Sequence, residues 1–358
     1  MRNSHTLISG DARDLGDLAD ASVDLVVTSP PYPLVAMWDA SFAAQSPAAA
    51  AALAAGDAAA AFAAMHAVLD AAWAEVARVL RPGGFVCVNI GDATRTLAGR
   101  FALHPNHARV ALALGAAGLT LLPDILWRKP TNAPTKFLGS GMLPAGAYVT
   151  YEHEYVLVAR KGGPRTFPEA ERPRRAAGAY FWEERNQWFS DVWDRLPGAP
   201  QARRGSSAPR SGAFPVELPH RLIQMYSLPG DLVLDPFAGT GTTLAAAAAS
   251  GRSSVGVEHD PSLAPTVAAS LAAAPALGRA RAQARWQAHL AFAAARAAAG
   301  RPLPHRHASG HPVMTRQETT LTLWAPLSVE ASGPGAWEST AAVVAPPPLP
   351  VEPPPRAA

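Results

Sequence analysis

The chain has 358 residues, of which 49% are hydrophobic, and it carries a formal net charge of +3 with a sequence pI near 9.2. This length and apolar content allow one large domain with additions that folds without covalent staples. The one cysteine, Cys87, excludes an internal disulfide, and its apolar neighbours predict a packing role. Residues 1–5 have no apolar signal core, and no stretch of about 18 residues is free of charged and turn-forming residues, as a membrane-spanning helix requires. We therefore expect a cytoplasmic protein with no membrane partner.

Short apolar runs between turn-forming residues predict strands, and helix-forming stretches lie between several of them. The strands are expected at 5–9, 23–28, 85–90, 120–127, 154–160, 231–235 and 253–258. The helices are expected at 61–80, 105–117, 217–226 and 242–250. Such alternation predicts an α/β fold, with a mostly parallel sheet and helices on both faces.

Three segments interrupt this alternation. They are an alanine-rich insertion near 33–60, a basic and aromatic stretch at 161–210, and a helical and proline-rich C-terminal extension at 271–358. The rest of the chain forms a first part, 1–160, and a second part, 211–270, of one domain. The proline-rich composition of the extension cannot pack a core, so we expect it to stay extended or disordered. Its histidines lie among prolines and glycines, where chance explains them better than a metal site, and no metal is predicted.

The second part begins with the pattern of a ligand-binding strand, loop and helix. An apolar strand ends at Asp235, and Gly239 and Gly241 follow in a loop before an alanine-rich helix. Glycines let a ligand approach the main chain, and a strand-end carboxylate suits a cationic or hydroxylated ligand rather than a phosphate. Glu258 ends the next strand, where a doubly wound fold binds a ribose diol. Walker and dinucleotide patterns are absent, so the combination predicts S-adenosylmethionine.

A second motif follows the strand at 23–28 and reads Thr28-Ser29-Pro30-Pro31-Tyr32. Two prolines directly after a buried strand are unusual, because both lack an N–H donor and fix the backbone. An exocyclic base amine is a poor nucleophile until fixed acceptors localise its lone pair. The Ser29 side chain and the Pro30 carbonyl could accept its N–H bonds, while the Tyr32 ring could stack on a flipped base. The motif therefore predicts methyl transfer to a base amine, achieved largely by positioning.

Together, the two motifs resemble the β-type bacterial amino-methyltransferases of restriction-modification systems, in which the catalytic motif precedes the cofactor motif. The resemblance covers most of residues 5–260. It implies a Rossmann-like methyltransferase sheet of seven strands, circularly permuted, with a target recognition insert at 161–210. Twelve Lys or Arg against seven Asp or Glu between 160 and 221 suit double-stranded DNA as the partner. The resemblance also implies a cognate restriction endonuclease as a candidate partner.

The resemblance implies roles for individual residues. The catalytic residues are expected to be Ser29, Pro30, Pro31 and Tyr32. The cofactor-binding residues are expected to be Asp11, Phe214, Pro215, Asp235, Pro236, Phe237, Gly239, Gly241, Thr242 and Glu258. Among the latter, Asp11 would contact the adenine and Glu258 the ribose. The segment around Phe214 and Pro215 would close over the methionine part.

The target base follows from one residue of the catalytic motif. In this family, Ser-Pro-Pro-Tyr favours cytosine N4, whereas Asp or Asn in the first position indicates adenine N6. Carbon-5 methylation needs a thiolate nucleophile, and Cys87 lies far from both motifs in the sequence. An adenine-N6 enzyme remains an alternative, as does a silent DNA-binding protein, although such a protein would be expected to have lost Asp235 or Tyr32. The sequence carries no signal for the recognition sequence or the oligomeric state.

Overall fold

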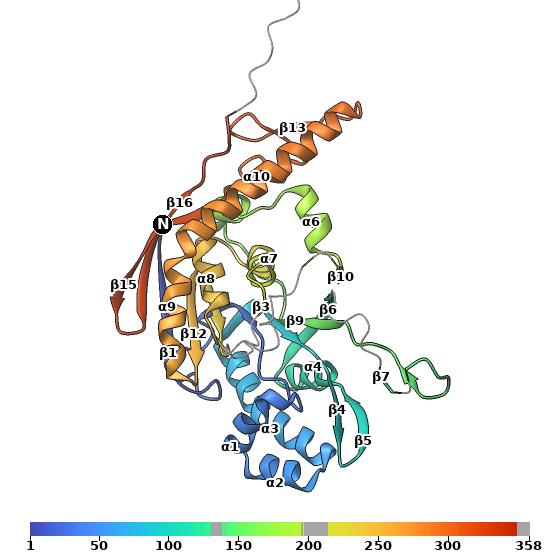
Figure 1. The fold of residues 1–358 in the computed structure, drawn as a ribbon. Helices are drawn as coiled ribbons and strands as arrows, with labels where there is room; N and C mark the ends of the chain where they lie inside the picture. Colours follow the sequence, from blue (N-terminus) through green and yellow to red (C-terminus); the bar gives the residue numbers. More distant parts are fainter. Residues whose placement is uncertain (130–137, 140, 195, 197–213, 349–358) are drawn as a thin grey trace, which may run out of the picture.

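The computed structural model describes residues 1–129, 138–139, 141–194, 196 and 214–348. Its centre is a ten-stranded mixed sheet in the order β10-β6-β9-β3-β2-β11-β12-β1-β16-β15 (Figure 1). The middle seven strands confirm the seven predicted strands. They are β6 (Leu119–Arg128), β9 (His153–Lys161), β3 (Leu80–Ile90), β2 (Val23–Thr28), β11 (Leu232–Asp235), β12 (Ser253–Glu258) and β1 (Arg2–Ser9). Among these seven only β9 is antiparallel to its neighbours.

The strand order brings the two sequence motifs together. β2 and β11 pair in parallel, with Leu25 opposite Val233 and Val26 opposite Leu234. Their carboxyl ends therefore meet at one edge of the sheet, which we call the catalytic edge. Ligands bind at this edge of open α/β sheets, where the strand order reverses.

Helices cover both faces of the sheet, as alternation predicts. On one face α3 (Ala58–Val79) packs against β3, and α4 (Asn106–Ala116) packs beside it against β6 and β9. On the other face lie α7 (Glu217–Tyr226) and α8 (Thr242–Ala249), whose core includes Cys87. These four helices confirm the predicted ones to within three residues at each end.

The helix α3 is long and apolar enough to cross a membrane by length and composition alone, although it carries Asp70, Glu75 and Arg78. Its sequence is Ala-rich, and four of its large side chains, Met65, Leu69, Trp73 and Val76, are buried against the sheet. In this protein the alanine-rich helix α3 is therefore part of the core.

The C-terminal extension is more structured than its composition indicates. α9 (Ala264–Ala272) and α10 (Ala274–Ala298) pack beside α8, and β15 (Trp324–Gly333) and β16 (Ala336–Val343) join the main sheet. Trp286 packs with Phe181, Leu321 and Leu323 in a separate small core. The expectation that the extension packs no core is therefore wrong for its described part, because scattered apolar residues meet across elements far apart in sequence. Residues 349–358 lie outside the described residues.

The remaining elements are short. The helices are α1 (Asp39–Gln45), α2 (Pro47–Ala55), α5 (Arg172–Ala177) and α6 (Trp182–Trp188), with 3-10 turns η1 (Ala36–Trp38), η2 (Glu169–Glu171), η3 (Pro261–Leu263) and η4 (Arg316–Glu318). The strands are β4 (Ala93–Leu97), β5 (Arg100–His104), β7 (Leu138–Gly139), β8 (Ala147–Tyr148), β10 (Val192–Trp193), β13 (His305–Arg306) and β14 (Pro312–Val313).

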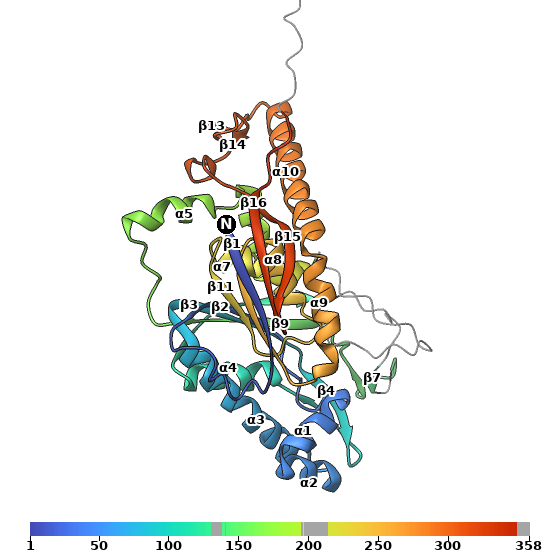
Figure 2. The same ribbon diagram turned by 90° about the vertical axis from the view of Figure 1, so that its left-hand side faces the viewer.

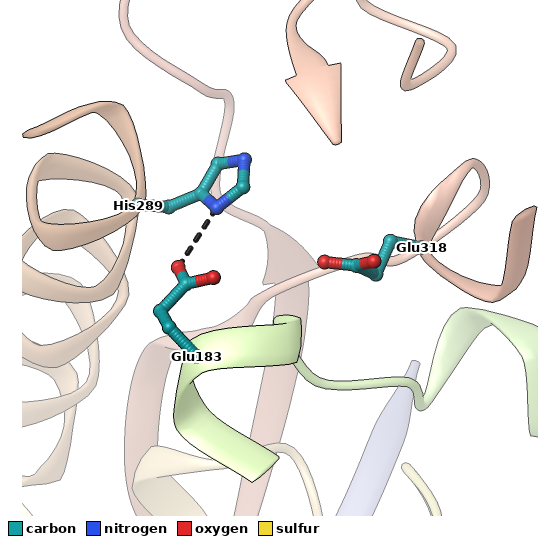
Figure 3. A group of neighbouring side chains, drawn as sticks. All are labelled: Glu183, His289 and Glu318. Atoms are coloured by element: carbon teal, nitrogen blue, oxygen red, sulfur yellow. Dashed lines mark hydrogen bonds and ion pairs between the residues drawn. The ribbon is translucent and has the colours of Figure 1, made fainter. Parts of the chain in front are cut away.

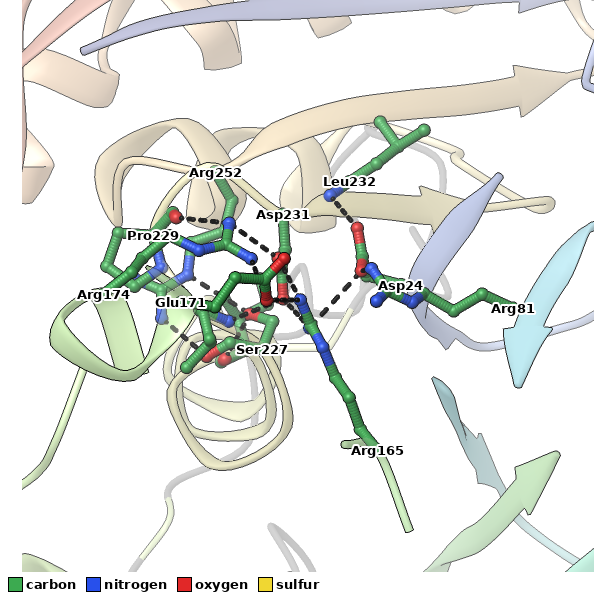
Figure 4. A network of polar contacts seen from close by, with 12 residues as sticks. Asp24, Arg81, Arg165, Glu171, Arg174, Ser227, Pro229, Asp231, Leu232 and Arg252 are labelled. Atoms are coloured by element: carbon green, nitrogen blue, oxygen red, sulfur yellow. Dashed lines mark hydrogen bonds and ion pairs between the residues drawn. The ribbon is translucent and has the colours of Figure 1, made fainter. Parts of the chain in front are cut away.

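An ionic network fastens the edge of the sheet opposite the catalytic edge (Figure 4). Asp231 and Asp24 lie where β11 and β2 begin, and both carboxylates are buried. Arg165 Nη1 lies 2.7 Å from Asp231 Oδ2 and 3.4 Å from Asp24 Oδ1, and Arg174 Nη1 lies 3.1 Å from Asp231 Oδ1. A Cβ at Gly83 would come within 2.7 Å of the Arg165 Cα, so this glycine permits the close approach. The network holds residues 165–174 against the strand starts.

Replacing Arg165 should destabilise the fold. Arg165→Met leaves Asp231 and Asp24 short of positive charge in a buried place, so we expect a loss of about 3 kcal/mol in the free energy of unfolding. Arg128→Met is the matched control, because its side chain is 63% exposed and lies 3.6 Å from Glu152, and such a surface pair contributes about 0.5 kcal/mol or less. Chemical denaturation of both variants measures the difference. Equal losses would contradict the assignment.

Candidate active site

A hydrogen bond joins the two motifs at the catalytic edge. Thr28 Oγ1, at the end of β2, donates to Asp235 Oδ1, at the end of β11, across 2.6 Å. The Phe237 backbone N–H donates to the same oxygen at 3.1 Å. Both residues of the pair are buried. This contact fixes the catalytic loop that follows Thr28 relative to the glycine loop that follows Asp235.

A cavity of about 270 Å³ opens beside this bond, between the ends of β1, β2, β11 and β12. The predicted site residues that line it are Asp11, Ser29, Pro31, Pro236, Phe237, Gly239 and Glu258. Residues of both motifs therefore share one wall, and the Phe237 ring is held edge-on by Trp73 at 6.0 Å between centroids. The lining is mostly apolar with a few polar groups, as in sites for cofactors of moderate size.

The glycine loop has the backbone that its sequence predicts. Gly239 and Gly241 have φ angles of 51° and 77°. Space beside Gly239 is open, whereas a Cβ at Gly241 would lie 2.9 Å from Val267 Cγ1. Only Gly239 is thus positioned for close approach of a ligand, while Gly241 allows α9 to pack. Thr242 begins α8 directly behind the loop and does not line the cavity.

The carboxylate of Glu258 closes the loop from the neighbouring strand. Its Oε2 accepts the Gly239 N–H at 2.7 Å, and its Oε1 accepts the Asp260 N–H at 2.8 Å. A carboxylate held in this way at a cavity wall retains lone pairs for a diol. The ribose-binding role of Glu258 stays a prediction.

The catalytic loop is rigid beyond its two prolines. Leu34, two residues after Tyr32, is buried and has a φ angle of 61°. This left-handed conformation costs a residue other than glycine about 1 kcal/mol. Its N–H points at the Met65 sulfur, 3.4 Å away, so α3 packs directly under the loop.

The Tyr32 hydroxyl lies inside a polar group rather than in solvent. It is 3.1 Å from Ser29 Oγ and 3.1 Å from Glu154 Oε2, and it accepts the Asn89 side-chain N–H at 2.9 Å. Burial, followed by the nearby Glu154 charge, raises the pKa of Tyr32 well above its usual value. The phenol therefore stays protonated and can donate.

Some predicted residues are not brought to the cavity. Phe214 and Pro215 do not line it, and Phe214 instead packs with Leu218 and Val233 on the α7 face. Asp11 lines the cavity, but Arg13 binds its carboxylate, with Nε at 2.9 Å from Oδ1, and this pairing lowers the pKa of Asp11. Pro30, Tyr32 and Asp235 are not among the lining residues either.

Sequence reasoning missed two groups of residues. Trp38, Phe42 and Gln45 line the cavity from η1 and α1, inside the alanine-rich insertion for which the sequence predicted no site residue. The tryptophan and phenylalanine among alanines were the available signal. Asn89 and Glu154 contact Tyr32 from β3 and β9, and each is a polar residue near the end of an apolar strand.

The stretch 161–210 divides between the two edges of the sheet. Its first part, with α5 (Figure 2) and α6 (Figure 1), lies toward the end of the molecule opposite α1 and α2. There Arg165 and Arg174 are occupied by Asp231, and Phe181 and Trp188 are buried. β10 is parallel to β6 and so runs back to the catalytic edge. Residues 197–213 lie outside the described residues.

A carboxylate and imidazole cluster lies apart from the cavity (Figure 3). It consists of Glu183, His289 and Glu318, whose ligand-type atoms lie within 4.8 Å of one another. His289 Nδ1 is 2.8 Å from Glu183 Oε1, and Nε2 is 2.8 Å from the Pro312 carbonyl oxygen. Both partners are acceptors, so both ring nitrogens carry protons, whereas a metal ligand needs a free lone pair. Burial lowers the pKa of His289, but Glu183 and the Pro312 carbonyl raise it by more than burial lowers it. The net shift of the pKa is therefore upward. We interpret the cluster as an ion pair joining α6 to α10.

Comparison with known proteins identifies the family. The N6/N4 methyltransferase family, described as DNA methylase, matches residues 23–269. The Type II methyltransferase M.MthZI of Methanothermobacter thermautotrophicus is 51% identical over 263 residues, which are 73% of this chain and 74% of that protein. M.MjaI of Methanocaldococcus jannaschii is 45% identical over 293 residues, 75% of this chain and 91% of that protein.

A solved structure agrees with the sequence relatives. The DNA modification methylase TTHA0409 of Thermus thermophilus, complexed with S-adenosyl-L-methionine, is 34% identical with a TM-score of 0.58. The match covers 75% of this chain and 94% of that one. The chain therefore belongs to the N6/N4 DNA methylases. It is a DNA methyltransferase of the family that uses S-adenosylmethionine, on the predicted methyltransferase fold.

The ionisation of Asp235 should govern cofactor affinity. Burial raises its pKa to about 6, against the lowering effect of the Thr28 hydrogen bond. The cationic cofactor favours the charged carboxylate, so its affinity should rise with pH and level off above this value. One proton linked to binding gives about a tenfold tighter dissociation constant at pH 7 than at pH 5.

Calorimetric titration with S-adenosylmethionine between pH 5 and pH 8 measures this dependence. Asp235→Asn should bind more weakly at pH 7 and show a flat profile, since it cannot ionise. An unchanged slope in Asp235→Asn would assign the pH dependence to another group.

Proposed function

We propose that this protein transfers a methyl group from S-adenosylmethionine to the N4 amine of a flipped cytosine within a specific sequence of double-stranded DNA. The observation that carries the proposal is the place of Ser29. Its side chain lies at the end of β2, on the wall that it shares with Gly239 and Glu258. In the resemblance described above, serine at this position accompanies cytosine.

The chemistry asks for acceptors rather than for a strong base. The cofactor supplies an activated methyl group, and the amine must direct its lone pair toward it. Ser29 Oγ and the Pro30 carbonyl would accept the two N–H bonds of the amine, in a loop whose geometry is fixed beforehand. The Tyr32 ring would stack on the flipped base.

An adenine-N6 enzyme on the same scaffold remains the second candidate. The N6 amine of adenine is also exocyclic and conjugated to its ring, so the same acceptors would serve it. The two bases differ in size and in the edge that the pocket must read.

Double-stranded DNA would approach the catalytic edge. Segments that leave the sheet there include the β4–β5 hairpin and the chain between β6 and β9. They expose large apolar side chains, namely Phe101, Leu103, Met142 and Tyr148. The first part of 161–210 lies toward the other edge, so we propose target contacts from the later part of that stretch, together with these segments. A cognate restriction endonuclease would cut the same sequence.

The methylated nucleoside decides between the two bases. Expressed in a host without DNA methylation, the protein should leave N4-methylcytosine in genomic DNA, detected by mass spectrometry of the nucleosides. A catalytically dead Ser29→Ala/Tyr32→Ala double variant is the control for background. N6-methyladenine alone would overturn the cytosine assignment. The absence of both products would contradict the methyltransferase activity.

Substitutions should separate catalysis from cofactor binding. Ser29→Ala and Tyr32→Ala remove groups aimed at the base, so each should lower kcat by about 100-fold or more while changing the dissociation constant of S-adenosylmethionine little. Asp235→Ala should chiefly raise the dissociation constant of S-adenosylmethionine. Methyl-transfer kinetics and calorimetry measure the two effects. If all three variants lose cofactor affinity equally, this division of roles is wrong.

A further inference from the structure

Glu154 lies at the centre of the polar group around Tyr32. It stands near the start of β9, which begins at the catalytic edge because it runs against its neighbours. Its side chain is 15% exposed. Oε2 accepts from the Tyr32 hydroxyl at 3.1 Å and from Asn89 Nδ2 at 2.7 Å, and the Lys129 ammonium pairs with Oε1. Every strong contact of this carboxylate is therefore with a donor.

The donors and acceptors can be followed from Glu154 to Ser29. An ionised carboxylate has no proton, so the Tyr32 hydroxyl must donate to it. The phenol oxygen then accepts from Asn89 Nδ2 at 2.9 Å. Its remaining neighbour is Ser29 Oγ at 3.1 Å, and because the single phenol proton is already committed, the Ser29 hydroxyl donates to Tyr32. The backbone carbonyl oxygen of Asn89 lies 3.4 Å from the Tyr32 hydroxyl oxygen, so it is a more distant and weaker acceptor for that proton.

This direction has a consequence for the reacting amine. A serine hydroxyl has one proton and two lone pairs. With its proton held by Tyr32, Ser29 can only accept, which is the role that an amine nucleophile requires of it. If these hydrogen bonds had the opposite direction, Ser29 would donate its proton to the amine lone pair and compete with methyl transfer.

We propose that Glu154 is a positioning residue for methyl transfer, which acts by setting the direction of the hydrogen bonds from Glu154 through Tyr32 to Ser29. The proposal rests on the proposed transfer to a base amine, whichever base it is. The backbone at Gly91 fits this arrangement, since a Cβ there would meet Glu154 Cγ and Tyr32 Cε2, each at 3.1 Å. The glycine leaves room for the two side chains to meet.

Glu154→Gln tests the direction with little change of shape. A glutamine amide has one oxygen, which can face either Lys129 or the pair of Tyr32 and Asn89, but not both. When its NH2 faces Tyr32, the amide donates to the phenol oxygen, and the direction of the hydrogen bonds from residue 154 to Ser29 reverses. We expect kcat to fall by about 10- to 100-fold, with the dissociation constant of S-adenosylmethionine unchanged.

Glu330→Gln is the matched control, because it makes the same change of charge at an exposed residue of β15, outside both motifs and outside the segments proposed to contact DNA. It should keep the kcat of the wild type. All proteins are compared on unmethylated genomic DNA under single-turnover conditions, with circular dichroism and cofactor calorimetry confirming that each is folded.

Two further variants distinguish the direction of the bonds from general support of the fold. Lys129→Met frees the glutamine oxygen to face Tyr32, so Glu154→Gln/Lys129→Met should recover most of the lost kcat. Tyr32→Phe breaks the chain, so adding Glu154→Gln to it should lower kcat by about twofold at most.

Three results would overturn the proposal. They are a wild-type kcat for Glu154→Gln, a double variant with Lys129→Met no faster than Glu154→Gln, and a full additive loss in the Tyr32→Phe background. Absence of methyl transfer by the wild-type protein would contradict the proposed function, whereas the three results above concern the variants alone. The failures of the two proposals are therefore distinguishable.

Discussion

The hydrogen bond from Thr28 to Asp235 is the contact on which the site depends. It joins the ends of two parallel strands whose residues are 207 positions apart, and each strand continues into one of the two functional loops. A buried carboxylate needs such a donor, because an unpaired charge in the interior is costly. The same bond that satisfies Asp235 thus sets the spacing between the loop that follows Thr28 and the glycine loop that follows Asp235.

The two edges of the sheet use charge in different ways. At one edge, Asp231 and Asp24 are matched by arginines, and their charges are neutralised in place. At the other, Asp235 and Glu258 are held chiefly by hydroxyl and backbone donors. A carboxylate held by neutral donors keeps its negative potential available to a bound cation. Arg165 and Arg174 therefore stabilise the sheet, although the basic composition of their stretch of sequence indicates nucleic-acid contact.

Much of the fold could be predicted because central strands are buried on both faces and read as continuous apolar runs, as in 23–28 and 253–258. The outer strands β15 and β16 could not, because nearly half of their side chains are exposed and their pattern is weak. The glycine loop and Ser29 could be predicted because their chemistry is local. Trp38 and Glu154 could not, since each gains its place only when elements distant in sequence pack together. Phe214 shows the reverse, a motif residue whose contacts in the fold lie elsewhere.

The pairing of β1 with β16 closes the sheet between the first residues of the chain and a segment near position 340. Arg2 lies opposite Thr340, and Thr6 lies opposite Ala336. Elements that are extreme in sequence are therefore adjacent in space, as they are in proteins that tolerate relocated termini. A gene that joined these ends and opened elsewhere would encode the same neighbours in a new order. A different order of motifs along such a chain would leave the geometry of the site unchanged.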